Sequence, residues 1–249
     1  MGVLLAAGTA FEIEAPVLVV GAGACGLTAA LAAREGGAEV LVVERDRVPR
    51  GSTALSSGMI PACGTAAQRA RGVADSRALM AADIMRKAKG EADAALVEAV
   101  VAASGPAVDW LAASHGVDLP LVEGFLYPGH SVARMHAPPA RTGAALMDML
   151  ASAAERAGVD VFSEARVRDL LADADGTVRG VALERPDGKV ERIGCGALVL
   201  ACNGFGGNRE MVRAHIPEMA DAAYFGHPGN QGDAVLWGRA LGAATRHMG

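Results

Sequence analysis

The stretch "VLVVGAGACGLTAALAAREGGAEVLVVERD" runs from Val17 to Asp46 and carries the strongest indication of the fold. A short apolar run ends in glycine, an alanine-rich segment follows, and a second apolar run ends in an acid. We expect strands at 17–20 and 39–43 with a helix at 24–35 between them, because Gly36 and Gly37 supply a natural helix stop. A crossover of this kind joins parallel strands, so the stretch predicts a βαβ unit.

Three glycines, Gly21, Gly23 and Gly26, form a GxGxxG pattern between the first strand and the helix. The first permits a tight turn, the second lets the backbone approach a pyrophosphate, and the third lets helix and strand pack closely. The helix N-terminus offers free N–H groups and a partial positive charge to the phosphates. Glu44 ends the second strand, where a carboxylate can accept hydrogen bonds from ribose hydroxyls. The pattern predicts a dinucleotide site, and an acid rather than an arginine at position 44 disfavours NADP.

The composition excludes several classes of protein. The chain has 249 residues and a formal net charge of −5, and the mixed charges predict no nucleic-acid surface. Four cysteines without a CxxC pair favour a reducing, cytoplasmic location. We count no apolar run near the roughly 20 residues of a membrane span, so no direct membrane insertion is expected. Residues 1–15 are interpreted as a lead-in, since no basic residue precedes their apolar stretch.

The rest of the chain indicates one α/β fold with insertions. Residues 51–64 are rich in small residues and predict a segment that is loop at least in part, and 76–116 show helical patterns. A helix is expected at 142–157, a hairpin around Pro186, a buried strand at 197–201 and a last helix at 234–241. We therefore predict a Rossmann-like domain with a parallel sheet, a helical insertion and a hairpin or small antiparallel sheet.

The segments after the βαβ unit favour FAD over NAD. In a plain NAD domain the second strand leads quickly into another crossover helix. Here the small-residue loop at 51–64 suits close approach to a flat ring and its ribityl chain. The later hairpin and the glycine-rich strand end "ALVLACNGFGG" at 197–207 offer further contact points to an extended cofactor.

At this point the sequence resembles a known family, the FAD-dependent fumarate reductase and succinate dehydrogenase flavoproteins with their 3-ketosteroid dehydrogenase relatives. These are FAD-binding type 2 oxidoreductases. The resemblance is carried by "VLVVGAGACGLTAALAA", "VVERD", "GSTALSSGM", "SVARMHAPPARTG", "GTVRGV", "LVLACNGFGGN" and "GNQGDAVLWGRALGA", which span nearly the whole chain in the family's order. It implies an FAD-binding domain over residues 16–249.

The resemblance also implies roles for particular residues. Those near the start of the helix would line the pyrophosphate, and Glu44 would contact the adenosine ribose. Val167 matches a strand residue whose backbone contacts adenine, and Asp233 matches the acid of the family's G-D-G turn. The full implied cofactor-binding set is Gly21, Ala22, Gly23, Ala24, Cys25, Gly26, Glu44, Arg45, Ser52, Thr53, Ser57, Gly58, Met59, Val167, Ala201, Cys202, Gly204 and Asp233.

Three positions depart from the family pattern. Ser52 stands where some members carry the histidine that binds FAD covalently, so noncovalent FAD is expected. Asn203 and Met59 stand where glycines are usual, which affects the detailed flavin contacts rather than binding itself.

The polar segment around Arg134 and His136 has two interpretations. It is either a cationic loop near the flavin that holds an anionic substrate, which makes these two residues substrate-side candidates, or a solvated loop. The six histidines show no metal-ligand spacing, so no metal site is expected. Cys25 and Cys63 are interpreted as small buried residues rather than redox groups.

The resemblance places the remaining machinery beyond residue 249: a substrate-binding histidine, a capping domain, the proton-donating arginine and a C-terminal return to the FAD domain. We therefore expect this chain alone to be inactive. The whole enzyme would transfer a hydride between flavin N5 and a C–C bond of a small dicarboxylate or a 3-ketosteroid, with an unidentified electron donor or acceptor. The alternatives are an NAD-dependent dehydrogenase and a noncatalytic flavin-binding module.

Overall fold

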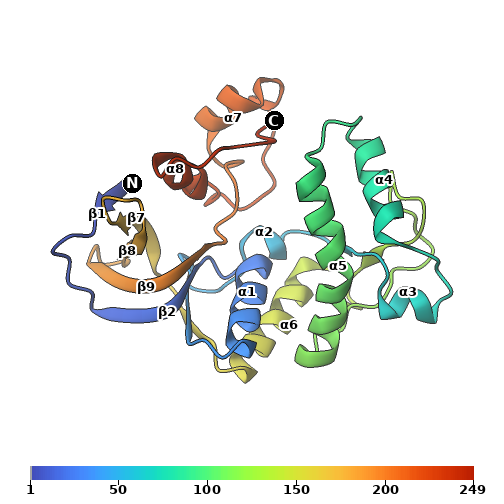
Figure 1. Ribbon diagram of the computed structural model, residues 1–249, viewed down its shortest axis with the longest axis horizontal. Coiled ribbons are helices and arrows are strands. Elements are labelled where there is room, and N and C mark those ends of the chain that lie inside the picture. Colours follow the sequence, from blue (N-terminus) through green and yellow to red (C-terminus); the bar gives the residue numbers. More distant parts are fainter. Residues whose placement is uncertain (1) are drawn as a thin grey trace. The chain divides into compact units, whose positions relative to one another are not determined.

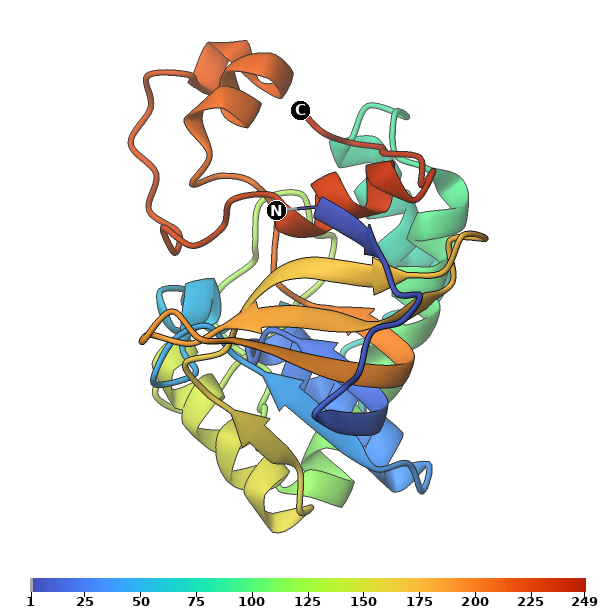
Figure 2. The ribbon, with the colours of Figure 1, turned by 90° about the vertical axis from the view of Figure 1, so that its left-hand side faces the viewer.

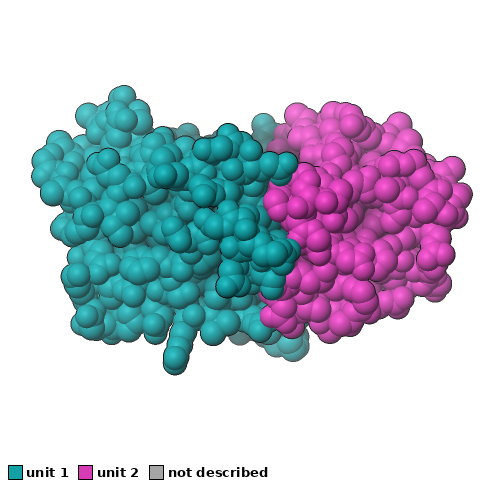
Figure 3. All heavy atoms as spheres, turned by 90° about the horizontal axis from the view of Figure 1, so that it is seen from below, with its two compact units in different colours: residues 1–55, 150–249 teal, residues 56–149 magenta. Residues whose placement is uncertain are grey.

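The computed structural model of the protein describes residues 2–249 (Figure 1). The chain forms two compact units (Figure 3). Unit 1 comprises Met1–Leu55 and Leu150–Gly249, and unit 2 comprises Ser56–Met149. The GxGxxG turn and the acid that ends the second strand both belong to unit 1.

Unit 1 is built on a seven-stranded sheet. Strands β2, β3, β6 and β9 run parallel to their neighbours in the order β9-β2-β3-β6, and β1 is parallel to β7. Strands β7, β8 and β9 form an antiparallel meander within the same sheet. This confirms the predicted α/β fold with a mostly parallel sheet. In sheet order the strands are β1 (Gly2–Leu5), β7 (Arg166–Ala172), β8 (Val178–Glu184), β9 (Val190–Leu200), β2 (Ile13–Val20), β3 (Val40–Val43) and β6 (Asp160–Phe162).

The predicted βαβ unit is present as β2, α1 (Ala24–Glu35) and β3. Helix α1 buries Leu27, Ala30 and Leu31, which share one helical face, and it packs on the sheet beside β2 (Figure 1). Leu18 and Val20 alternate along β2 and join a buried cluster that includes Trp237. Because β2, β3 and β9 are parallel, their carboxyl ends meet at one edge of the sheet, next to the N-terminus of α1.

Two parts of the sheet differ from the sequence predictions. Residues 2–5, interpreted as part of a lead-in, form edge strand β1, which pairs with β7 and lies beside α8 (Asp233–Ala240) (Figure 2). The hairpin arm and the strand expected at 197–201 are one continuous strand, β9. It pairs with β8 on one side and β2 on the other, so the sheet partners on both sides keep it extended through Gly194 and Gly196.

Unit 2 contains the predicted helical insertion and a small antiparallel sheet. Its helices α4 and α5 pack through a cluster of Cys63, Met80, Val97 and Val101. The elements are β4 (Ile60–Pro61), α3 (Ala66–Ala70), α4 (Arg77–Lys87), α5 (Ala94–His115) and β5 (Met135–His136); α6 (Gly143–Arg156) continues into unit 1, which also holds α2 (Gly51–Ala54), α7 (Arg209–His215) and the 3₁₀ turn η1 (Pro217–Met219).

Helix α5 confirms part of the helical pattern predicted over 76–116. It runs through Pro106, from an Asp93 cap to a left-handed Gly116. Of the helices in residues 2–249, α5 is the one whose length and composition would suit a membrane span, with a mean hydropathy of 1.4. This corrects our count of apolar runs, although core helices of soluble proteins meet the same criterion.

Candidate functional site

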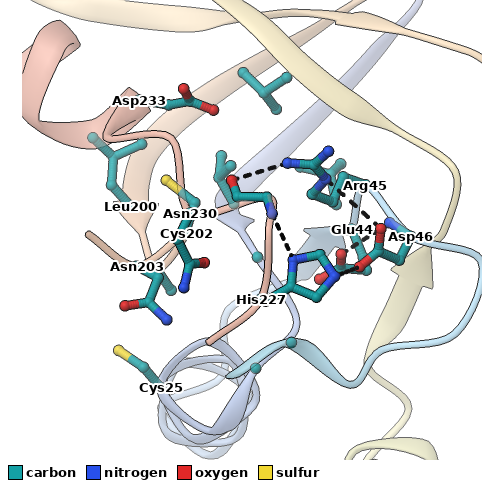
Figure 4. Close-up of a pocket in the computed structure, with 18 of the residues that line it drawn as sticks. Cys25, Glu44, Arg45, Asp46, Leu200, Cys202, Asn203, His227, Asn230 and Asp233 are labelled. Atoms are coloured by element: carbon teal, nitrogen blue, oxygen red, sulfur yellow. Dashed lines mark hydrogen bonds and ion pairs between the residues drawn. The ribbon is translucent and has the colours of Figure 1, made fainter. Parts of the chain in front are cut away.

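A cavity of about 380 Å³ lies at the carboxyl edge of the parallel strands in unit 1 (Figure 4). Its walls come from the ends of β2, β3 and β9, the N-terminus of α1, helix α2, the start of β7 and the segment 227–237. Ligands of open α/β sheets bind at this edge, because the helix N-termini and the loops that follow the strands converge there.

The three glycines of the turn serve different purposes. A Cβ at Gly26 would collide with the Gly21 carbonyl, and a Cβ at Gly21, whose φ is +103°, would lie 2.6 Å from the Ala201 carbonyl oxygen. Gly23 has an ordinary φ of −74°, and the nearest atom to a Cβ there would be Thr53 Oγ1 at 3.5 Å. Protein packing therefore requires the first and third glycines. The space beside Gly23 opens into the cavity and suits a ligand.

Glu44 is held at the end of β3 by backbone amides. Its Oε2 accepts a hydrogen bond from Ala22 N–H at 2.8 Å, and its Oε1 accepts one from Asp46 N–H at 2.9 Å. Only 7% of the residue is exposed, yet it lines the cavity. Each carboxylate oxygen keeps further acceptor capacity, so Glu44 can receive hydroxyl donors such as those of a ribose.

The N-terminus of α1 suits an anion. The N-cap residue, Gly23, has no side chain to cap the helix, and the first turn carries no acid. The Ala24 N–H donates to Thr53 Oγ1 at 3.2 Å, which ties α2 to this end of α1. A helix N-terminus presents N–H groups and a partial positive charge, so this end of the cavity fits a diphosphate.

Two buried polar atoms beside the cavity have no partner among the described residues: Asp233 Oδ1 and Trp237 Nε1. Both residues line the cavity from α8, and Trp237 is only 1% exposed. Burial raises the pKa of Asp233, while Arg166 and Arg45 act in the opposite direction. Buried polar atoms are nearly always hydrogen-bonded, so a ligand with hydroxyl donors and ring-nitrogen acceptors would complete the site. FAD has both, and the residues present fit it.

Cys202 lines the cavity as a neutral thiol. Burial, reinforced by Asp233, raises its pKa to about 11. The thiol therefore acts as a small wall residue and supplies no thiolate.

Most of the implied cofactor residues converge on this cavity. Two others, Ala22 and Gly26, are buried behind the turn and support it rather than lining the cavity. Gly204 lies outside the lining, and its carbonyl accepts from Gly232 N–H. Ser57, Gly58 and Met59 belong to unit 2, so their contact with FAD stays a prediction. The implied residues that line the cavity are Gly21, Gly23, Ala24, Cys25, Glu44, Arg45, Ser52, Thr53, Val167, Ala201, Cys202 and Asp233.

Several residues that line the cavity had no role predicted from the sequence. Two of the polar ones, His227 and Asn230, belong to the segment "FGHPGNQGD" at 225–233, in which only Asp233 was assigned a role from the sequence. Its glycines and polar residues directly before a helix were the available signal, since such loops gather at the carboxyl edge of a parallel sheet. The unassigned lining residues include Asp46, Arg166, His227, Gly229, Asn230 and Trp237.

Arg134 lies inside unit 2 and is only 1% exposed. Its Nε and Nη2 donate to the two oxygens of Asp75 at 2.8 and 2.9 Å, and its Nη1 donates to Asp83 at 2.5 Å. Arg86 and Ser131 also donate to Asp83. All three guanidinium nitrogens of Arg134 therefore donate to carboxylates within the unit, and its charge is neutralised there.

His136 is also buried, with no exposed surface. Its Nδ1 donates to the Arg134 carbonyl, and its Nε2 accepts from Thr65 Oγ1, both at 2.8 Å. Burial lowers its pKa, so it is held in the neutral form. The two substrate-side candidates thus do not form a cationic surface, and we reassign them to the packing of unit 2. The segment looked exposed in the sequence because Asp75 and Asp83, their buried partners, lie far away along the chain.

Within residues 2–249 no group of three His, Cys, Asp or Glu side chains is arranged to hold a metal ion.

The turn, the anchored acid and the unpartnered groups define an FAD-binding site of the Rossmann class. Residues 16–248 match the family model described as FAD binding domain, and the chain belongs to this family. It is 33% identical over 230 residues to the probable fumarate reductase Ifc3 of Shewanella frigidimarina (strain NCIMB 400). The matched region covers 92% of this chain and 39% of the relative. The chain thus spans about two fifths of that relative's length, and the predicted cofactor, FAD, is confirmed.

Two solved structures support the same assignment. The open conformation of a flavocytochrome c3 fumarate reductase has a TM-score of 0.88 and 32% identity, covering 96% of this chain and 42% of that chain. The 3-ketosteroid-delta4-(5alpha)-dehydrogenase from Rhodococcus jostii RHA1 has a TM-score of 0.87 and 29% identity, covering 99% of this chain and 58% of that chain. These comparisons confirm the resemblance to fumarate reductase flavoproteins and their 3-ketosteroid dehydrogenase relatives.

Proposed function

We propose that the whole protein is an FAD-dependent oxidoreductase that reduces the C=C bond of a small unsaturated dicarboxylate. The observation that carries this proposal is the 33% identity to a fumarate reductase across 92% of this chain, combined with an FAD cavity whose donors and acceptors fit the cofactor. When bound, FAD supplies or accepts a hydride at its N5 atom.

Within this proposal the described residues bind and orient the cofactor. The N-terminus of α1, with Ser52 and Thr53, holds the diphosphate, and Glu44 and Asp233 accept hydroxyl hydrogens. The substrate-binding and proton-donating groups come from the part of the relatives' length that this chain does not cover. An external electron donor and a reducing, cytoplasmic compartment complete the proposal. The four cysteines are all free thiols, which supports such a compartment.

A 3-ketosteroid substrate is the second candidate. It is favoured by the TM-score of 0.87 to the ketosteroid dehydrogenase, whose complex holds 4-androstene-3,17-dione. Fumarate and this steroid share a C=C bond conjugated to a carbonyl, so one hydride-transfer site serves either chemistry. The substrate pocket would differ in size and polarity.

The experiment compares both substrates on the whole FAD-loaded protein. Under anaerobic conditions the flavin is reduced with a dye, and its reoxidation is followed at visible wavelengths after adding fumarate or 4-androstene-3,17-dione. Rapid reoxidation by fumarate alone supports the proposal, and reoxidation by the steroid alone replaces it with the second candidate. A flavin that responds to neither indicates a noncatalytic flavin-binding module.

The mode of FAD attachment is tested first on the present chain. We propose noncovalent FAD, since Ser52 occupies the position of the attachment histidine. Acid precipitation of the yellow protein should release intact FAD into the supernatant. Colour retained in the pellet contradicts this part of the proposal.

A further inference from the structure

A polar loop at residues 226–231, which we call the 226–231 clamp, is hydrogen-bonded across one wall of the FAD cavity (Figure 4). Arg45 Nη1 donates to the Gly229 carbonyl at 2.9 Å, and His227 Nε2 lies 2.9 Å from Asp46 Oδ2. The clamp is thereby fixed to the two residues that directly follow Glu44, the ribose-facing acid.

The imidazole of His227 is oriented from both sides. Its Nδ1 accepts a hydrogen bond from Gly229 N–H at 3.0 Å. In the neutral ring the hydrogen must then lie on Nε2, which donates to Asp46. His227 therefore shapes the clamp from within and also anchors it to Asp46.

The clamp also contacts Ser52, and this contact determines what the Ser52 hydroxyl can do. Ser52 Oγ accepts from the backbone N–H of His227 at 3.0 Å and from Asn230 Nδ2 at 2.8 Å. A serine hydroxyl has two acceptor sites and one hydrogen to donate. With both acceptor sites occupied, Ser52 can interact with a ligand only as a donor, and a phosphate oxygen of FAD can only accept.

Asn230 is held rigidly enough to impose this arrangement. It is 7% exposed, and its backbone carbonyl accepts from Gly207 N–H at 2.9 Å, which fixes the main chain at this position. Its side-chain Nδ2 also donates to Tyr224 Oη at 2.5 Å. The second hydrogen of the amide is thus bound outside the cavity, and the first points to Ser52.

We propose that the 226–231 clamp makes Ser52 an obligatory hydrogen-bond donor to the FAD diphosphate, with Asn230 and His227 as positioning residues that act through Ser52. This inference rests on FAD binding by unit 1 and does not depend on which substrate the whole protein reduces. It assigns a role to a loop outside the GxGxxG motif.

The test is a double-mutant cycle on FAD affinity, measured by the quenching of FAD fluorescence on binding. Removing one hydrogen bond to a charged group should weaken binding by about 10-fold to 100-fold, so Ser52→Ala sets the reference. Asn230→Ala should weaken binding by a similar factor in the wild-type background and cause little further loss when Ser52 is already alanine. In ³¹P NMR of bound FAD, Ser52→Ala and Asn230→Ala should shift the same diphosphate resonance.

Asn203→Gly is the matched control. Asn203 lines the same cavity, but its side chain bonds the adjacent Gly204 N–H, and its φ of +69° suits glycine. Its effect on FAD affinity should add to that of Ser52→Ala. Additive effects of Asn230→Ala and Ser52→Ala, or a ³¹P spectrum unchanged by Asn230→Ala, would overturn the proposal.

A second variant guards against misfolding of Asn230→Ala. Asn230→Asp keeps the side-chain size, but its carboxylate cannot donate to Ser52 and competes for the hydroxyl hydrogen. Its loss of affinity should be larger in the wild-type background than in Ser52→Ala. An equal loss in both backgrounds counts against the proposal. Loss of FAD binding by the wild-type chain would instead contradict the FAD site itself, whatever the turnover assay gives.

Discussion

At the scale of single residues, the GxGxxG pattern combines two kinds of requirement. The backbone itself demands glycine at positions 21 and 26, where a side chain would meet the Ala201 and Gly21 carbonyls. At Gly23 a methyl group would find its nearest neighbour, Thr53 Oγ1, at 3.5 Å, so the demand for glycine there comes from the ligand. A change at position 23 should therefore separate binding from folding.

We expect Gly23→Ala to leave the thermal midpoint of the FAD-free protein nearly unchanged while weakening FAD binding by at least about tenfold, which is about 1.4 kcal/mol. Gly26→Ala, the matched control, should lower the thermal midpoint of the FAD-free protein because the turn cannot close. Thermal denaturation and fluorescence titration measure the two effects. Equal loss of stability in both variants would contradict this division of roles.

A second residue-scale prediction concerns Asp83. It accepts hydrogen bonds from Arg134 and Ser131 while 2% exposed, so Asp83→Asn leaves a buried guanidinium with one carboxylate partner instead of two. Removing one member of a buried charge network typically costs about 3 kcal/mol or more of unfolding free energy. Denaturant unfolding measures this. Asp173→Asn, which breaks the exposed pair between Asp173 and Arg179, is the control and should change stability little.

At the scale of elements, sheet partners and helix packing override local sequence signals. Strand β9 passes through two glycines because it is paired on both edges. Helix α5 passes through Pro106 because its remaining hydrogen bonds and its packing on α4 outweigh the one bond that proline cannot make. Gly105, beside this proline, lets the helix approach the Cys63 carbonyl, where a Cβ would collide.

Pro106 is exposed, so its replacement isolates the backbone effect. We expect Pro106→Ala to restore the missing N–H and raise the free energy of unfolding by about 1 kcal/mol. Alanine removes the cost of proline inside a helix, and this gain exceeds the loss that comes from a more flexible unfolded chain. Ala99 is exposed and lies earlier in the same helix, so Ala99→Pro should lower the free energy of unfolding by about 3 kcal/mol. Similar destabilisation by both substitutions would show that Pro106 is required by the fold.

At the scale of the whole molecule, the FAD cavity and the buried Arg134 network lie in different units. The FAD cavity is lined by residues of unit 1 alone, and the Arg134 network lies in unit 2. Cofactor binding and acid sensitivity should therefore be measurable as separate properties of the chain.

FAD binding should protect amides in unit 1 from hydrogen exchange. We expect slower exchange at 17–27, 41–54, 200–207 and 224–237, because these segments form the cavity. Hydrogen exchange by mass spectrometry with and without saturating FAD measures this. Protection at 57–59 would support the predicted contact of Ser57, Gly58 and Met59. Unchanged exchange at 224–237 would contradict the placement of the clamp at the cofactor.

Acid should destabilise unit 2. Burial lowers the pKa of His136 below its ordinary value of 6.5, so the unfolded chain takes up a proton in a range where the folded chain does not. Stability is therefore complete above pH 6.5 and falls below it, by up to about 1.4 kcal/mol per pH unit for this group. His136→Gln should reduce the slope of unfolding free energy between pH 6.5 and 5.5. A slope equal to that of the wild type would contradict the prediction.

The sequence by itself determined the βαβ unit, the GxGxxG turn, the acid at position 44 and the FAD cofactor. The first three depend on spacing along a short stretch, where the strand and helix periods and glycine's missing side chain act locally. The cofactor followed from motifs spread over nearly the whole chain. The hairpin around Pro186 was predictable because it, too, depends on a short local stretch.

The tertiary structure decided what depends on distant partners. Arg134 looks like a surface cation until Asp75 and Asp83 surround it, and residues 2–5 become a strand only because β7 offers an edge. Asn230 and His227 reach Ser52 across 178 and 175 positions of the chain. Such contacts follow from how the parallel sheet gathers its carboxyl ends, which no local pattern in the sequence records.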